Sequence, residues 1–261
     1  MTRRRRGGAQ EAGEAATPGH RAPRPNRRTL QVALNGDSSH PAMPRTAEET
    51  AADAAACVAA GANLLHLHAF DDDGEETLAE GPVARAITAV RALCPGVPIS
   101  MTTFAQIEPD ATRRLKLIAS WTTLPDLVPA NQGEAGIVEL SELLALRGVG
   151  LEACLLSVAD AELFVRRNTP ELFRRVVIEA LDTDPSTAVA DAAAMEQMVT
   201  EAGMSLDQLH HGYGIATWDV CRRAAERGHG IRIGIEDTGL LPDGRPAAGN
   251  VELVQAARDL L

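Results

Sequence analysis

The sequence contains little of what a membrane, secreted or nucleic-acid-binding protein normally carries. Aromatic side chains make up only 3% of its 261 residues, and the body of the chain has no nucleic-acid-binding motif, so we expect no nucleic-acid partner. No run of about 18 uncharged apolar residues occurs, and the N-terminus lacks the apolar centre of a secretory signal. We therefore expect no membrane contact and a cytoplasmic location.

Side chains that support particular reaction types are also scarce. The four cysteines lie far apart, without a C-x-x-C pair, which favours free buried thiols over a disulfide framework or a cysteine-based zinc site. The single lysine, Lys116, falls in a predicted helical segment away from any strand end. A Schiff-base aldolase, which needs a lysine at the reacting centre, is therefore not favoured.

Charge divides the chain into two unequal parts. The formal net charge is −11, yet residues 1–28 contain eight arginines against two glutamates. This segment is rich in Gly, Ala, Pro and Arg and has almost no large apolar residues, so we predict a disordered basic tail at 1–28 and a folded catalytic domain at 29–261. A basic tail can contact nucleic acid or anionic lipid, but a solvated tail is the simpler interpretation.

Short apolar runs alternate with Ala-rich amphipathic segments from residue 29 onward, which is typical of βα units and a parallel sheet. Eight such units in an α/β chain of this length predict a (β/α)8 TIM barrel. An open doubly wound sheet is the structural alternative, but neither G-x-G-x-x-G nor G-x-x-x-x-G-K-[ST] follows the first strand. The predicted strands are 30–36, 63–68, 97–102, 126–130, 149–155, 175–180, 206–211 and 231–236.

The clearest predicted helices are 46–61 and 187–203. In the first helix, we expect Thr46 to cap the N-terminus, Glu49 to complete a capping box and Gly61 to end the helix. A second glycine, Gly203, is expected to end the other helix.

Two predicted strands present polar side chains where a barrel places its active site. His66 and His68 share one face at the C-terminal end of the second strand. In the eighth strand, Arg232 and Glu236 share the inward face, and Asp237 follows at the rim. An Arg232–Glu236 ion pair would account for the buried charges, but the two histidines and Glu236 also match the three-ligand pattern of catalytic zinc. Because strands two and eight both flank strand one, we expect these three side chains to meet.

In these segments the chain resembles the β-keto acid cleavage enzyme family, whose founding activity is 3-keto-5-aminohexanoate cleavage. The resemblance spans nearly all of 30–261 and rests on ALNG, PRTAEETAADAAACVAAGANLLHLH, ITAVRALCPGVPISMTT, LPDLVPAN and RIGIEDTGLLPDGRPAAGNVELV. The H-L-H pair followed by R-x-G-x-E-D is its most specific part. The resemblance implies a zinc-dependent (β/α)8 barrel, commonly a homo-oligomer (tetramer or dimer), that converts a β-keto acid and acetyl-CoA into acetoacetate and the CoA thioester of the shortened acid.

Residue by residue, the resemblance implies that His66, His68 and Glu236 bind Zn2+, while Arg232 and Asp237 act at the reacting centre. A carboxylate such as Asp237 can remove the proton that lies between the two carbonyl groups of a β-keto acid. A permanently cationic guanidinium can keep that carboxylate ionised or stabilise a developing oxyanion. The expected chemistry is therefore Claisen and retro-Claisen carbon–carbon bond formation and cleavage.

Other residues near strand ends are expected on the substrate side. The resemblance implies a substrate-facing acid at Glu152, for which an ion pair with a nearby arginine is the alternative. It also implies substrate contacts at Thr102, Thr103 and Asn131. We expect His211, at the end of strand seven, to line the pocket, with a structural role shared with His210 as the alternative.

Two segments depart from the family pattern. The family usually has Ser/Thr-Thr-Gly-Gly after strand three, whereas this chain has TTFAQ, with Phe104 and Ala105 in place of the glycines. Near the end of strand four, Pro129 stands where the family has a hydroxyl group, and proline has no such donor. We expect these changes to alter the substrate side chain that is accepted, or to abolish the activity.

Two other functions remain open from the sequence. A metal-dependent aldolase or hydrolase on the same barrel would act without CoA, because a bound metal can also activate an aldol substrate or water. A catalytically inactive barrel with a partner-binding basic tail is the second alternative, and only the tail supports it. Dependence on acetyl-CoA distinguishes the first alternative from the predicted activity.

Overall fold

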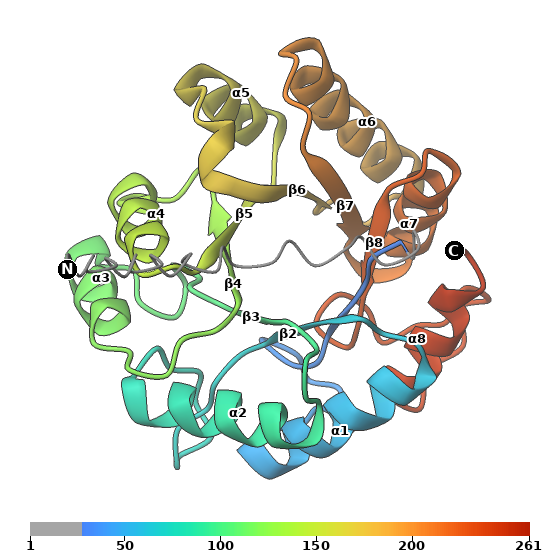
Figure 1. Ribbon diagram of the computed structural model, residues 1–261. Coiled ribbons are helices and arrows are strands. Elements are labelled where there is room, and N and C mark those ends of the chain that lie inside the picture. Colours follow the sequence, from blue (N-terminus) through green and yellow to red (C-terminus); the bar gives the residue numbers. More distant parts are fainter. Residues whose placement is uncertain (1–27) are drawn as a thin grey trace, which may run out of the picture.

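The computed structural model describes residues 28–261, so the disorder predicted for residues 1–27 lies outside the described part of the chain. Arg28, the last residue of the predicted tail, donates a hydrogen bond to the Ala225 carbonyl at 2.6 Å. Eight parallel strands close into a barrel in the order β1 to β8, and the helices form a ring around it (Figure 1). The predicted (β/α)8 barrel is confirmed. Between residues 28 and 261, no helix is long and apolar enough to cross a membrane.

The strands are β1 Leu30–Ala33, β2 Leu64–Leu67, β3 Ile99–Met101, β4 Leu127–Asn131, β5 Gly150–Leu155, β6 Phe173–Ala180, β7 Asp207–Gly212 and β8 Gly230–Ile233. The α-helices are α1 Ala47–Ala60, α2 Glu80–Leu93, α3 Ala111–Ala119, α4 Ile137–Leu146, α5 Val158–Arg167, α6 Pro185–Glu201, α7 Thr217–Glu226 and α8 Asn250–Arg258. Short 3-10 helices, η1 and η2, lie at Pro170–Leu172 and Gly214–Ala216.

Local sequence signals set the ends of the clearest helices. Thr46 caps α1 and forms the expected capping box with Glu49, and Gly61 follows the last turn with a φ of 133°. Helix α6 begins earlier than predicted, because Asp184 caps it ahead of a proline at the first helical position. Both predicted helices are therefore confirmed, with a shifted start for the second.

Strand β8 is shorter than predicted, and the difference decides where the acidic residues lie. The strand ends at Ile233, because the amides of Asp237 and Thr238 both donate back to the Gly234 carbonyl at 2.9 Å and close a turn. Glu236 is therefore carried by this turn and not by the strand. The turn points it across the top of β1, toward β2.

A glycine permits this crossing. Strand β1 pairs with β2 on one side and β8 on the other, as predicted. A Cβ atom at Gly234 would lie 1.9 Å from the Ala33 carbonyl oxygen, far inside van der Waals contact. Gly36, just beyond β1, has a φ of 139°, and a Cβ there would meet the Glu236 side chain at 3.0 Å. Glycine at both positions lets the β8 turn approach β1 closely.

The outward faces of the strands are apolar, whereas the barrel interior contains a polar column. Ile231 and Ile233 are fully buried in the core that the strands form with the helices. Inside the barrel, the Ser100 hydroxyl donates to Glu152 at 2.7 Å, and the other Glu152 oxygen lies 3.4 Å from the Arg175 guanidinium.

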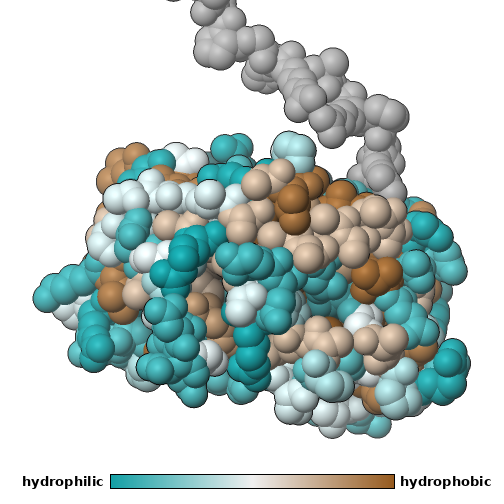
Figure 2. Space-filling view, turned by 90° about the horizontal axis from the view of Figure 1, so that it is seen from below, coloured by the Kyte–Doolittle hydropathy of each residue, from teal (hydrophilic) through white to brown (hydrophobic). Residues whose placement is uncertain are grey.

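On the outside, the face seen from the side of α1 and α2 mixes hydrophilic side chains with apolar areas (Figure 2).

A buried carboxylate ties α6 to α7 on the outside of the barrel. Glu196 accepts hydrogen bonds from Arg227 and His229 at 2.6 and 2.9 Å, and it lies 2.6 Å from Arg223. Burial raises the pKa of Glu196, but hydrogen bonds from these three cationic or polar partners outweigh burial and lower it to about 2. His210 stacks on His229 with ring centres 4.8 Å apart.

We predict that Glu196→Gln destabilises the fold by about 3 kcal/mol at neutral pH, because the buried carboxylate is the shared counter-charge of the partly buried Arg223 and the more exposed Arg227. The lowered pKa of the native carboxyl means that its stabilisation is present above the ordinary pKa of 4.5 and is lost as the pH falls toward 2. Urea unfolding of both proteins should therefore show a smaller difference in acid than at neutral pH. Glu201→Gln, at an exposed position of α6, is the control. Equal stability of the Glu196 variant and the parent at neutral pH would contradict the prediction.

Candidate active site

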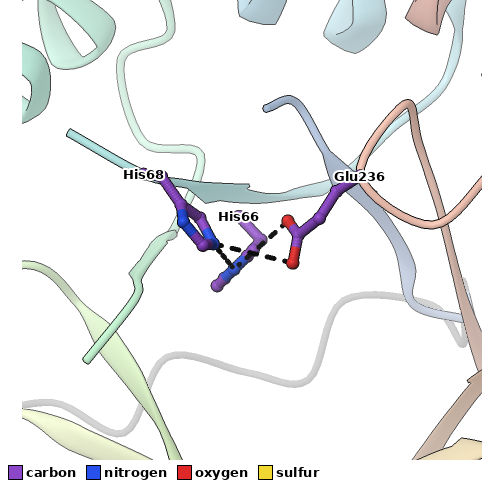
Figure 3. A group of neighbouring side chains, drawn as sticks. All are labelled: His66, His68 and Glu236. Atoms are coloured by element: carbon purple, nitrogen blue, oxygen red, sulfur yellow. Dashed lines mark hydrogen bonds and ion pairs between the residues drawn. The ribbon is translucent and has the colours of Figure 1, made fainter. Parts of the chain in front are cut away.

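Three side chains converge at the C-terminal rim of the barrel (Figure 3). His66 lies in β2, His68 directly follows β2, and Glu236 lies in the turn after β8. The Nε2 atoms of His66 and His68 lie 3.3 Å apart. One Glu236 oxygen lies 3.5 Å from His66 Nε2, and the other lies 3.6 Å from His68 Nε2. The structure therefore brings together the three residues that were predicted as metal ligands.

The backbone of His68 is fixed although this residue lies just beyond β2. The Asn35 side-chain oxygen accepts from the His68 amide at 2.8 Å, and the Asn35 amide group donates to the His68 carbonyl at 3.2 Å. Asn35 belongs to the segment after β1, so β1 supports its neighbour through a side chain after the regular strand pairing ends. This clamp sets the direction in which the His68 ring leaves the backbone.

The spacing of the three side chains suits a tetrahedral metal ion. Ligand atoms bound at about 2.1 Å to a tetrahedral ion lie about 3.4 Å from one another, close to the separations of 3.3, 3.5 and 3.6 Å found here. One Glu236 oxygen is buried without a hydrogen-bond partner among the described residues. Two imidazoles and one carboxylate are also the donor set of a common class of catalytic zinc site. The residues present fit a zinc ion.

Electrostatics keeps Glu236 ionised. Burial raises its pKa, but Arg232 and the two histidines outweigh burial and hold the pKa well below its usual range. Burial lowers the pKa of His66 well below its usual value. Burial lowers the pKa of His68 too, but Glu236 and Glu76 raise it to about 9. Glu236 is thus ionised and His66 is neutral. Carboxylates on both sides of His68 favour the protonated form of its ring.

Arg232 contacts both Glu236, a predicted metal ligand, and Asp237, the predicted base. Its Nη2 atom lies 2.5 Å from a Glu236 oxygen and 2.8 Å from an Asp237 oxygen, and its Nε atom donates to the second Asp237 oxygen at 3.2 Å. The Arg232–Glu236 ion pair considered from the sequence therefore exists alongside the histidine contacts. Asp237 is buried behind the guanidinium, and Arg232 is the member of this pair that lines the adjoining cavity.

A small cavity of about 60 Å3 opens beside the three candidate ligands. Of the other residues predicted for the site, Thr102, Asn131 and Arg232 line it. The rest of its wall is formed by Phe104, Pro129, Cys154, Leu156 and Glu179. Glu179 is the one charged residue among these five, and the other four are apolar.

Several predicted site residues lie behind the cavity wall. The Thr103 hydroxyl donates to the Pro129 carbonyl at 3.0 Å. His211 is fully buried, with its ring nitrogens 3.3 Å from an Asp237 oxygen and 3.6 Å from a Glu179 oxygen. Glu152 is 1% exposed and lies in the polar column beneath His66, where it contacts Ser100 and Arg175. The arginine partner considered for Glu152 is thus present.

An ion pair between Glu134 and Arg114 holds the loop that contains Phe104 and Ala105, the two residues that stand in place of the family's usual glycines. Glu134 accepts hydrogen bonds from the Ala105 amide at 3.0 Å and from the Asn131 side chain at 2.8 Å. Its other oxygen lies 3.3 Å from Arg114, which is almost completely buried. Side-chain contacts through Glu134 thus hold the segment that presents Phe104 to the cavity.

Two acidic residues near the site, Glu179 and Glu76, were not predicted from the sequence. Glu179 lies on the inward face of β6, and the alternation of RVVIEA, with Ile178 buried outward, was a signal that could have identified it. Glu76 lies in the loop after β2 and contacts the second nitrogen of His68 at 2.9 Å. No periodicity marks a loop residue, so the sequence carried no comparable signal for Glu76.

A second group of potential ligands, Glu196, His210 and His229, lies outside the barrel. Two arginines already occupy the Glu196 carboxylate, and their charge opposes a metal cation there. This group stabilises the contact between α6 and α7 and is not a candidate metal centre.

Solved structures with similar folds include several barrel enzymes. ObcA in a ternary complex with a C4-CoA adduct and oxalate is similar at a TM-score of 0.71 and 14% identity over 84% of this chain, which spans 63% of the length of ObcA. A type I 3-dehydroquinate dehydratase from Clostridium difficile is similar at a TM-score of 0.62 and 13% identity, covering 90% of this chain and 92% of that one. At these identities, the likeness establishes the fold alone.

Sequence comparisons are more specific. The chain is 27% identical over 229 residues to the 3-keto-5-aminohexanoate cleavage enzyme of Fusobacterium nucleatum, covering 83% of each protein. It is 24% identical over 237 residues to the enzyme of the same name from Acetoanaerobium sticklandii, again covering 83% of each. A model of the beta-keto acid cleavage enzyme family matches residues 28–199 and 185–261. The two matches span all the described residues, and the chain belongs to the beta-keto acid cleavage enzyme family.

Proposed function

We propose that this protein is a zinc-dependent β-keto acid cleavage enzyme that uses acetyl-CoA as co-substrate, with 29–261 as its catalytic domain. The products would be acetoacetate and the CoA thioester of the shortened acid. The observation that carries the proposal is the convergence of His66, His68 and Glu236 beside Arg232, at the rim where barrel enzymes bind their substrates. The names of the two sequence relatives support a β-keto acid substrate, and the CoA adduct bound by ObcA is compatible with a CoA thioester.

His66, His68 and Glu236 would hold the zinc ion. When bound, zinc would supply Lewis-acid polarisation of the substrate's oxygen atoms, which makes the carbon between the carbonyl groups more acidic. Arg232 borders the cavity and would stabilise negative charge on the substrate. Glu236 and Asp237 hold its guanidinium in one orientation.

Asp237 is proposed as the base. It would take a proton from the carbon between the carbonyl groups, and this requires its carboxylate to turn from Arg232 toward the cavity. The resulting carbanion would attack the thioester carbonyl of acetyl-CoA, forming a carbon–carbon bond and releasing the CoA thiolate. That thiolate would then attack the original ketone carbon. Cleavage of the older carbon–carbon bond gives the new thioester and the acetoacetate carbanion, which recovers the proton from Asp237.

The cavity wall would select the substrate. Thr102 and Asn131 line the cavity with polar groups and are proposed as substrate contacts. Thr103, His211 and Glu152 lie behind the wall, so for these residues we propose supporting roles. We also propose a homo-oligomer, dimer or tetramer, and a cytoplasmic location, as the family resemblance suggests.

The metal proposal predicts about one zinc ion per purified chain, falling to almost none in a His66→Ala, His68→Ala double variant, because two of three ligands are lost. Elemental analysis by mass spectrometry measures this content directly. His40→Ala, a histidine outside the three-ligand group, is the control. Equal zinc in the double variant and the parent would eliminate the site.

The co-substrate proposal predicts that acetoacetate and a new CoA thioester form together, and only when acetyl-CoA is present. A panel of β-keto acids that differ in side-chain length and charge should be incubated with the zinc-loaded protein, and both products followed by mass spectrometry. Cleavage that proceeds equally well without acetyl-CoA would favour the metal-dependent aldolase or hydrolase.

The base assignment predicts that Asp237→Asn lowers kcat by about 100-fold or more while changing KM little, because the side chain can still accept from Arg232 but cannot take a proton. Glu179→Gln is the matched variant, since Glu179 is a second carboxylate at the cavity. A larger loss of kcat in Glu179→Gln than in Asp237→Asn would transfer the role of base to Glu179.

A further inference from the structure

Each histidine of the candidate metal site turns its second ring nitrogen toward a different partner. His66 and His68 offer Nε2 to the site, where both Nε2 atoms face Glu236. The Nδ1 atom of His68 lies 2.9 Å from a Glu76 oxygen, and the Nδ1 atom of His66 lies 3.4 Å from the Ser100 hydroxyl oxygen. A proton on Nδ1 leaves the lone pair of Nε2 free for a metal, so a partner that accepts from Nδ1 selects the tautomer that can bind.

The Glu76 carboxylate is held by a small hairpin in the loop after β2. Phe70 and Glu76 form an antiparallel bridge across this loop. Within the loop, the Asp71 side chain accepts from the Glu75 amide at 3.0 Å. The Arg45 guanidinium lies over the Phe70 ring, 5.6 Å from its centre. Glu76 therefore reaches His68 from a closed loop and not from a free chain.

The partner of His66 belongs to a directional chain inside the barrel. The Ser100 hydroxyl donates its hydrogen to a Glu152 oxygen at 2.7 Å. Its oxygen lone pairs are then available to accept from His66 Nδ1. Arg175 lies 3.4 Å from the other Glu152 oxygen and holds that carboxylate from below. The charge of Glu152 thus fixes the direction of the Ser100 hydroxyl, and through it the orientation of His66.

We infer that Glu76, and Glu152 acting through Ser100, are positioning residues that fix the tautomer and orientation of the two histidine ligands. This inference rests on the proposed metal site. In this inference Glu152 orients His66 through Ser100 and does not contact the substrate. The loop 70–77 likewise gains, through Glu76, a function that its sequence does not reveal.

The two supports differ in accessibility, and this makes Glu76 the better residue to test. The Glu76 side chain is 20% exposed, whereas the Glu152 side chain is 2% exposed and ion-paired inside the barrel. Truncation of Glu76 leaves the barrel interior intact. Outer partners of metal-bound histidines commonly change metal affinity by about 10- to 100-fold when they are removed.

The test compares zinc affinity in four proteins by competition with a chromogenic chelator. These are the parent, Glu76→Ala, Glu76→Gln and Glu75→Ala. Glu75 is a neighbouring acid in the same loop with no contact to His68 in the described structure, so its variant controls for the loss of one negative charge. We expect Glu76→Ala to weaken zinc binding about 10- to 100-fold. Glu76→Gln should retain most of the affinity, because its carbonyl oxygen can still accept from Nδ1, and Glu75→Ala should bind like the parent.

Thermal unfolding of the metal-free proteins separates positioning from loop stability. A purely structural Glu76 would lower the melting temperature of Glu76→Ala without weakening zinc binding, and this result would overturn the inference while leaving the metal site intact. A parent protein that binds no zinc would overturn the proposed metal site itself. As a second arm, Ser100→Ala should weaken zinc binding in the same direction, and unchanged affinity in that variant would remove the part assigned to Ser100 and Glu152.

Discussion

The site depends on one shared carboxylate. Glu236 faces two imidazoles on one side and a guanidinium on the other, and none of these contacts is possible unless the β8 turn lies across the end of β1. A carboxylate at this depth needs compensating charge, and Arg232 supplies it. Arg232 in turn is shared with Asp237. The candidate metal ligands and the residues proposed for the proton transfer therefore form one electrostatic unit.

The barrel interior supports this unit from below. In many barrels, layers of branched apolar side chains fill the centre, but here Ser100, Glu152 and Arg175 form a polar column under His66. Buried charges are tolerated when they are paired and hydrogen-bonded. Burying the charges of Glu152 and Arg175 is unfavourable in free energy, but the column places the Ser100 hydroxyl against the His66 ring. Buried apolar side chains of the strands and helices instead form the main hydrophobic core.

Local patterns predicted the fold and the convergence of His66, His68 and Glu236, because both follow from short-range rules. Strand alternation placed His66 and His68 on one face, and parallel strand order placed β8 next to β1. The depth of each side chain could not be predicted in this way. Asp237 lies behind Arg232, because the turn after β8 begins three residues earlier than expected. His211, at the end of β7, lies behind Glu179. Glu76 reaches the site through a loop, where no repeating pattern constrains the sequence.

The Glu134–Arg114 ion pair has a consequence for how this protein could diversify. It anchors the segments that carry Phe104 and Asn131. The candidate metal ligands His66 and His68 are held by separate contacts with Asn35, Glu76 and Ser100. Two groups of residues that are held by different side-chain contacts thus border one cavity. On the proposed function, wall residues such as Phe104 can be replaced with little disturbance of the candidate metal ligands, so the proposed chemistry can be combined with substrates of different shape.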